Sequence, residues 1–434
     1  MTDRAPAPRS TTSAPGYRTY EVYQRTRVDE TTALIKPRQL ASLEFAVDPY
    51  PALALLREHY PCYRDWPGNA FWITRYDDVT SVFVDEANFE TRSKRWFYGI
   101  ETFGRDLGNE LGVLACRAQR VDAAASPLAE RVVGEFAASG ATDLATELGA
   151  RFAMELLAHE LALPPDDVAT FTARWWRMQR GWLWEPRAQL DGRAAVDELV
   201  AYVEPLLLAR RREPGDDMIS AIGALDLPDG PATAADVVAT LLEDDHETLY
   251  GTLANLWFLL LTHPTELAQV ADDRRFVKLA WLEAVRHSPP VLAARRFARH
   301  EVERFGRLLP AGALVICSAA AANRDPRQFD DADAFVVDRR DLCAREPRGH
   351  YRADGLPTGI SFGTGQPSKH PALPEDRPRS RYAITRDTSV AVSNALLDAV
   401  TDLRIADGAT PHLRSLRVGE MRTCWRLPVA FRAR

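Results

Sequence analysis

One segment of this chain, residues 281–339, restricts the possible fold more than any other part of the sequence. Its motifs occur in the order Glu283-x-x-Arg286, Arg296-Phe297-Ala298, Leu309-Pro310-Ala311-Gly312, Ala321-Ala322-Asn323-Arg324-Asp325-Pro326, Phe329, Phe335 and Asp338-Arg339. A Glu-x-x-Arg pair by itself is typical of an exposed ion pair on one face of a helix, which stabilises a protein little. The ordered set is far more specific than the pair, and it indicates one defined fold.

In order and spacing, this set of motifs resembles bacterial cytochrome P450s. Two further stretches share the likeness: residues 72–79 are similar to the first sheet of that family, and Leu427-Pro428-Val429 resembles its last strand. The resemblance covers nearly the whole chain after about residue 45. It implies a mainly α-helical fold with small β-sheets, the cytochrome P450 fold. It also implies that Glu283, Arg286 and Arg339 form a buried salt-bridged triad behind a heme.

The chain organisation is consistent with one large domain. Residues 1–16 are rich in Pro, Ser, Thr and Ala without an apolar run, so we expect a disordered leader rather than a secretory signal. Residues 17–434 are predicted to form a single P450-like domain. Thr233 and Asp236 predict a capping box that opens one long helix reaching about His263. Other helices are predicted over residues 126–212, 272–287 and 387–400, and strands over 70–74 and 313–316.

Charge and cysteine content exclude several classes of protein. The net charge is −7, with both signs interspersed, so no basic stripe suits nucleic acid. The five cysteines are far apart and form no CxxC pair, unlike a disulfide framework or a zinc site. The longest apolar stretch, residues 253–261, is too short to span a bilayer. We therefore expect a cytoplasmic protein that binds neither nucleic acid nor membranes.

The loop that holds the heme in the resembled family is altered in this chain. The family pattern is Phe-Gly-x-Gly-x-His-x-Cys-x-Gly, in which the cysteine thiolate ligates the iron. Here Phe362 and Gly363 begin the pattern correctly. Counting on from Phe362, Pro367 replaces the histidine, Lys369 the cysteine and Pro371 the last glycine. The resemblance therefore leaves heme b as a candidate cofactor, but thiolate ligation is not expected.

Other residues are candidates for holding a heme without that cysteine. His370 is the better substitute ligand, since imidazole binds heme iron in other proteins; the alternative is an ordinary histidine on a surface loop. Cys343 and Cys424 are interpreted as incidental thiols. By resemblance, Arg296 and either Arg120 or Arg117 match the basic residues that bind heme carboxylates.

The predicted long helix carries a second departure from the family. Glu247 and Thr248 match the acid–alcohol pair that relays protons to bound oxygen in the family, whereas Asp244 and Asp245 replace its small residues. At 100° per residue, one helix face should hold Val237, Leu241, Asp244, Thr248, Gly251, Thr252 and Asn255. In the family this face looks onto heme and substrate. We therefore assign Thr248, Glu247, Asp244 and Asp245 as candidate catalytic residues, but ordinary monooxygenation is not expected.

Glu243-x-x-His246 has the spacing used in di-iron carboxylate bundles. A single copy of this motif is weak support for a metal site, and charge pairing with nearby arginines is the alternative. We predict no metal centre.

Three interpretations of function remain open. The chain looks like heme-free P450 homologues that support glycosyltransferases, which suggests a repurposed auxiliary or binding protein of natural-product (secondary) metabolism. Alternatively, it is an oxidoreductase with a non-cysteine heme ligand or a residual monooxygenase-type role. The third interpretation is a heme-free enzyme using the acidic pocket on the long helix. Expected partners are a small apolar ligand or natural-product intermediate and a glycosyltransferase-like protein, or a ferredoxin if heme and oxygen chemistry survive.

Overall fold

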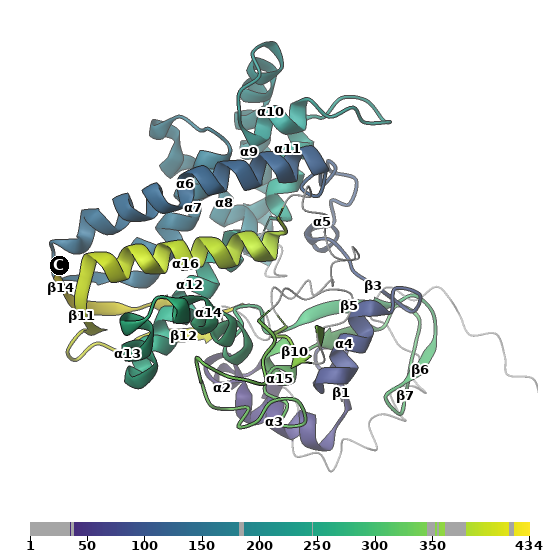
Figure 1. Ribbon diagram of the computed structural model, residues 1–434. Helices are drawn as coiled ribbons and strands as arrows, with labels where there is room; N and C mark the ends of the chain where they lie inside the picture. Colours follow the sequence, from purple (N-terminus) through teal and green to yellow (C-terminus); the bar gives the residue numbers. More distant parts are fainter. Residues whose placement is uncertain are drawn as a thin grey trace, which may run out of the picture.

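The computed structural model describes residues 35, 39–181, 186–244, 246–344, 352–353, 356–360, 379–415 and 421–434. Helices form most of this part of the chain and gather on one side of the molecule, while the largest sheet lies on the other side (Figure 1). The predicted mainly helical fold with small sheets is therefore confirmed. The predicted leader, residues 1–16, lies outside the described residues.

The helices fill most of the described chain. They are α2 (Leu43–Val47), α3 (Tyr50–His59), α4 (Tyr76–Val84), α5 (Lys94–Tyr98), α6 (Leu111–Ala137), α7 (Arg151–Glu160), α8 (Val168–Gly181), α9 (Pro186–Arg212), α10 (Met218–Gly223), α11 (Ala234–Leu242), α12 (His246–Thr262), α13 (Pro264–Asp272), α14 (Arg275–His287), α15 (Ala319–Ala322) and α16 (Arg381–Ala399). Shorter 3-10 or π turns lie at η1 (Gln39–Ala41), η2 (Leu144–Ala150) and η3 (Pro165–Asp167).

The strands form one five-stranded sheet and several small ones. They are β1 (Cys62–Asp65), β2 (Ala70–Ile73), β3 (Phe89–Glu90), β4 (Ala141–Asp143), β5 (Ala294–Ala298), β6 (Val302–Arg304), β7 (Arg307–Leu309), β8 (Leu314–Cys317), β9 (Arg352–Ala353), β10 (Leu356–Pro357), β11 (Val400–Ile405), β12 (His412–Ser415), β13 (Arg422–Arg426) and β14 (Pro428–Ala433). The large sheet has the order β1-β2-β8-β5-β3, and β2 pairs with β8 in parallel. The other neighbouring strands of this sheet are antiparallel.

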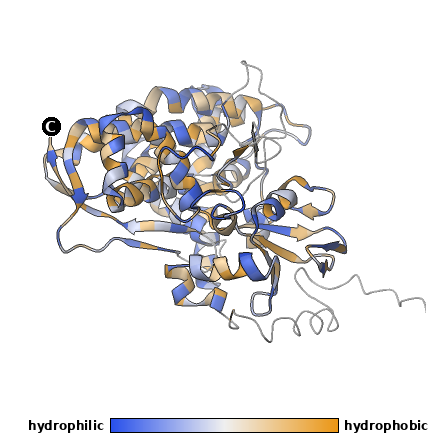
Figure 2. Ribbon diagram, turned by 60° about the horizontal axis from the view of Figure 1, so that its bottom comes forward, coloured by the Kyte–Doolittle hydropathy of each residue, from blue (hydrophilic) through white to orange (hydrophobic). Residues whose placement is uncertain are grey.

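Helix α12 passes through the middle of the helical core. Almost all of its residues are buried, so it is apolar around most of its circumference, as a core helix must be. The surrounding helices instead alternate hydrophobic and hydrophilic residues along their length (Figure 2). Trp257 of α12 and Trp281 of α14 are among the largest fully buried side chains. The core therefore forms around α12, and whatever interrupts this helix lies deep in the molecule.

Several predicted helix boundaries were wrong. The long helix is interrupted after Leu242 and restarts at His246, although the predicted Thr233–Asp236 capping box is present. The last helix begins at Arg381, where Ser380 caps its first turn, rather than at residue 387. Helix α14 begins at Arg275, because α13 ends at Asp272 and a short turn separates the two.

The three residues of the predicted triad lie together with almost no exposed surface. Glu283 accepts hydrogen bonds from Arg286 Nε (to Oε2) and Arg286 Nη2 (to Oε1), each 2.7 Å, and from Arg339 Nε at 3.2 Å. Arg286 also donates to the backbone carbonyls of Asn323 and Ala332 at 2.7 and 2.8 Å. The cluster thus ties α14 to the irregular segment after α15. Removing one partner would leave a buried charge without compensation.

We predict that Glu283→Gln lowers the free energy of unfolding by about 3–5 kcal/mol, because Arg286 and Arg339 lose their buried counter-charge. Urea denaturation at pH 7 measures this change. The matched control is Glu303→Gln on the exposed face of β6, which should stay within about 0.5 kcal/mol of the parent. Equal effects for the two substitutions would contradict the structural role of the triad.

Within the described residues, no helix is long and apolar enough to cross a membrane.

Candidate functional site

The interruption between α11 and α12 is satisfied by side chains from other helices. A helix end leaves backbone carbonyls without intrahelical partners. Gln179 of α8 donates its amide to the carbonyls of Leu241 and Leu242, at 3.0 and 3.1 Å. Arg381 of α16 donates to the carbonyl of Glu243 at 3.3 Å, and Lys94 of α5 to that of Asp244 at 3.3 Å. The break is therefore a specific feature supported by three separate elements.

The side chain of Glu243 explains part of this break. Its carboxylate accepts from the backbone N–H groups of Lys94 (3.1 Å) and Arg95 (3.2 Å) at the beginning of α5, and it also lies 3.6 Å from Arg95 Nε. Lys94 Nζ in turn donates to Gln179 Oε1 at 2.8 Å. These contacts connect α5, α8 and the break in one polar network.

Beside the break lies a buried cluster of four charged or titratable side chains, which we call the tetrad: Arg117, Glu160, Asp244 and His246. Arg117 forms ion pairs with Glu160 (2.9 Å) and Asp244 (2.9 Å). His246 Nδ1 lies 2.8 Å from Asp244 Oδ2, and His246 Nε2 lies 3.0 Å from Glu160 Oε1. The tetrad joins α6, α7 and α12 at the break, and none of its members is more than 8% exposed.

The tetrad stays charged because its members compensate one another. Burial alone would lower the pKa of His246, but Asp244 and Glu160 outweigh it and raise that pKa to about 9. Burial alone would raise the pKa of Asp244, but Arg117 and His246 hold it well below its usual value. Asp244 and His246 are therefore both charged at neutral pH.

The tetrad predicts a pH dependence of stability. Because the pKa of His246 is raised in the folded state, its contribution is complete below about pH 6.5 and is lost as the pH rises through about 9. The difference in unfolding free energy between the parent and His246→Gln should therefore shrink over this range, by an amount on the order of 3 kcal/mol. Urea titrations at several pH values measure the difference. The exposed His300→Gln should give a difference that is flat with pH.

Among the other candidate catalytic residues, the structure positions only some. Thr248 is buried in the first turn of α12, next to His246 of the tetrad. Glu247 is partly exposed, and Asp245 lies outside the described residues. The second half of the predicted common face packs against other parts of the protein. Gly251 packs closely against Pro290 and the strand β13 region, and Asn255 donates its amide to the backbone carbonyls of Ser288 and Arg422. The second half of this face is therefore covered by β13 and by the segment that follows α14.

The candidate heme-binding residues have protein partners or lie outside the described part. Arg120 donates to the backbone carbonyl of His159, and Arg117 belongs to the tetrad. Arg296 is buried on β5, donates to the carbonyl of Arg295 and lies 4.7 Å from the ring centre of Phe83. Outside the described residues are Phe362, Gly363, Lys369 and His370.

The two thiols that sequence analysis set aside are buried. Cys343 donates its backbone N–H to the carbonyl of Pro357. The Cys424 thiol lies 3.2 Å from the carbonyl of Arg426, and burial raises its pKa to about 12. A thiol in such a setting resists forming the thiolate that would bind iron.

The residues around Arg381 do not fit a heme in the position that the family resemblance implies. That position lies between the central helix and the start of the helix that follows the altered loop, here α16. In this structure the two are bridged directly by Arg381, whose side chain bonds the carbonyl of Glu243. Gly108 lies so close to Arg381 that a β-carbon there would touch its guanidinium. A porphyrin between these elements would have to displace Arg381 and its contacts.

The Glu243-x-x-His246 motif does not form a metal site here. Glu243 faces the beginning of α5, whereas His246 faces Asp244 and Glu160. Across the described residues, no group of three or more His, Cys, Asp or Glu side chains is arranged to hold a metal ion.

Helices α5, α8 and α9 pack closely against one another near the break. The Tyr98 hydroxyl donates to the carbonyl of Met178 and lies between Gly181 and Gly192. A β-carbon on either glycine would collide with that hydroxyl. Fully buried Trp175 of α8 belongs to the core beneath, while Trp182 and Trp184 lie outside the described residues. We call α5, α8 and the start of α9 the roof.

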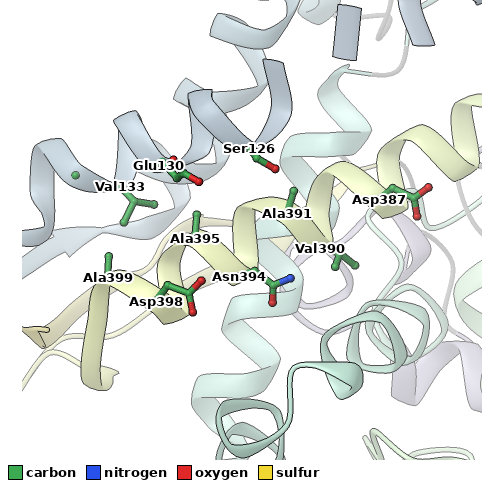
Figure 3. Close-up of a pocket in the computed structure, with 11 residues that line it drawn as sticks. Ser126, Glu130, Val133, Asp387, Val390, Ala391, Asn394, Ala395, Asp398 and Ala399 are labelled. Carbon is green, nitrogen blue, oxygen red and sulfur yellow. The ribbon is translucent and has the colours of Figure 1, made fainter. Parts of the chain in front are cut away.

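An open groove of about 670 Å³ lies elsewhere, between α6 and α16 (Figure 3). Its floor is formed by small and apolar side chains, and carboxylates stand at its edges; the lining residues are Ser126, Glu130, Val133, Gly134, Asp387, Val390, Ala391, Asn394, Ala395, Asp398 and Ala399. Two of these carboxylates are paired, Asp387 with Arg379 and Asp398 with Arg274. The groove is separate from the tetrad and the break.

Sequence analysis missed four residues of the site: Lys94, Glu160, Gln179 and Arg381. A signal existed for Glu160, since it lies three and four residues after the buried Leu157 and Leu156 and therefore on the apolar face of its helix. The same signal existed for Gln179, which lies four residues after the buried Trp175. Lys94 and Arg381 carry no such signal, because they donate to backbone carbonyls exposed by a break that the sequence pattern does not show.

Comparison with known proteins found similarity over most of the chain. Pulcherriminic acid synthase of Bacillus subtilis (strain 168) is 25% identical over 394 residues, which cover 86% of this chain and 93% of that protein. The cytochrome P450 monooxygenase PikC of Streptomyces venezuelae is 27% identical over 354 residues, covering 75% and 81% of the two chains. The Bacillus subtilis 168 bacillaene polyketide synthase cytochrome P450 PksS has a similar structure, with a TM-score of 0.73 and 19% identity over 92% of this chain and all of that one. No protein-family model matches the chain.

Proposed function

We propose that this chain, which is homologous to bacterial-type cytochrome P450s in sequence and shares their fold, works in secondary metabolism without a thiolate-ligated heme. The relatives support the setting, because their names include a synthase, a monooxygenase and a P450 of a polyketide synthase. The departure from their chemistry is our inference from this chain's own residues.

The contact between Arg381 and the carbonyl of Glu243 carries this proposal. It joins the start of α16 to the break in the central helix, across the space that a heme would need. The tetrad adds support, since Arg117 is fully engaged by Glu160 and Asp244. The sequence adds a separate argument, because Lys369 stands where the family has its cysteine. Iron without a thiolate lacks the electron donation that favours O–O cleavage.

A scaffold of this kind is suited to binding rather than to oxygen chemistry. We propose a heme-free auxiliary or binding protein that takes a small apolar ligand or natural-product intermediate and acts with a partner protein, such as a glycosyltransferase. A ferredoxin partner would follow only if heme and oxygen chemistry survived. The alternative in which the acidic pocket performs acid–base catalysis has less support, because Asp244 and His246 are buried and paired with each other.

An absorption titration with hemin tests the proposal. The purified full-length protein is mixed with one to several equivalents of hemin, desalted, reduced and exposed to CO, with apomyoglobin as a positive control. We expect no stoichiometric Soret band to remain with the protein. Arg381 lies in the space that a porphyrin would need. Arg117, a cation that could bind a heme carboxylate, is already paired with Asp244.

Two results would contradict this expectation in different ways. A reduced-CO band at about 450 nm would establish thiolate ligation and overturn the proposal outright. A stoichiometric Soret band without it would support the alternative of a non-cysteine ligand. His370→Ala, with His300→Ala as its control, would then show whether that ligand is His370.

A further inference from the structure

We propose that the break in the central helix is a latch for the roof: α5 and α8 are held closed by the groups that the break exposes, and they open together. This inference concerns the ligand-free protein. Its relevance to ligand entry rests on the proposed binding function, but the latch itself does not depend on whether heme binds.

The first half of the latch is Gln179. Its side chain is completely buried, and its amide group donates to two backbone carbonyls at the end of α11, those of Leu241 and Leu242. If α8 moved away, both carbonyls would lose this donor inside the protein. Buried carbonyls without a donor are unfavourable, so this contact holds α8 against the break.

The second half is Lys94. Its ammonium donates both to Gln179 Oε1 (2.8 Å) and to the carbonyl of Asp244 (3.3 Å), so it bridges α8 and the break from the α5 side. The Glu243 carboxylate holds the backbone at the beginning of the same helix. Because Gln179 accepts from Lys94 and donates to α11, loss of either residue removes one hydrogen bond from the other. The two helices should therefore release cooperatively.

Charged groups from several elements surround the break and stabilise it by ion pairs and hydrogen bonds. The groups that face it come from every neighbouring element: Lys94 and Arg95 from α5, Arg117 from α6, Glu160 from α7, Glu243 and Asp244 from the break, His246 and Glu247 from α12, and Arg381 from α16. The tetrad fixes the break from below, while Gln179, Lys94 and Glu243 join it to the roof above.

Hydrogen–deuterium exchange on the ligand-free full-length protein tests the latch. We expect Gln179→Leu to speed backbone exchange by about tenfold in α5, a helix that does not contain the substitution. Lys94→Met should do the same in the last turn of α8. Lys94 is only partly buried, so this second variant keeps the test available if Gln179→Leu folds poorly.

The control is Arg174→Gln, which removes an ion pair between α8 and Glu198 of α9 but does not touch the break. It should leave exchange in α5 unchanged. In the double variant of Gln179 and Lys94, the increase should be smaller than the product of the two single increases, because both act on one latch. Increases that multiply, or that stay within the substituted helix, would overturn the proposal. A heme-binding result would not affect this outcome.

Discussion

Two carboxylates in the protein core, Glu160 and Asp244, are both paired with Arg117 and His246, which lie between them. This mutual compensation determines much of the surrounding structure. It holds α6 and α7 against the beginning of α12, and it stabilises a turn of chain in the middle of the core where a continuous helix would otherwise run. An acidic residue at the start of α12 also suits the positive end of that helix.

Two arginines near the centre of the molecule are engaged by other protein groups. Arg117 faces inward to the tetrad, and Arg381 crosses from α16 to the carbonyl of Glu243. The scaffold of the bacterial P450s is retained, including the Glu283 cluster that fixes α14. The shared fold and these contacts of Arg117 and Arg381 are the observations on which the function proposed above is based.

The sequence was a good guide to the fold because the relevant signals are local. The capping box of Thr233 and Asp236 acts through near neighbours, and the run of apolar residues after Ala70 marks a strand although its partner β8 lies far away in the sequence. The break was not predictable in the same way. Leu241 and Leu242 before it and Leu249 after it keep the apolar pattern of one continuous helix. Its partners Gln179 and Arg381 come from sequence positions far away, so periodicity could not reveal it.

The glycines beneath Tyr98 have a consequence for how this protein can change. Gly181 and Gly192 do not have positive φ angles, so glycine is needed here because it has no side chain and not because of its backbone conformation. Even one methyl group at either position would press on the tyrosine hydroxyl. The spacing between the end of α8 and the start of α9 is thus set by the smallest side chain available. At these two positions the contact between α8 and α9 leaves no room for a larger side chain.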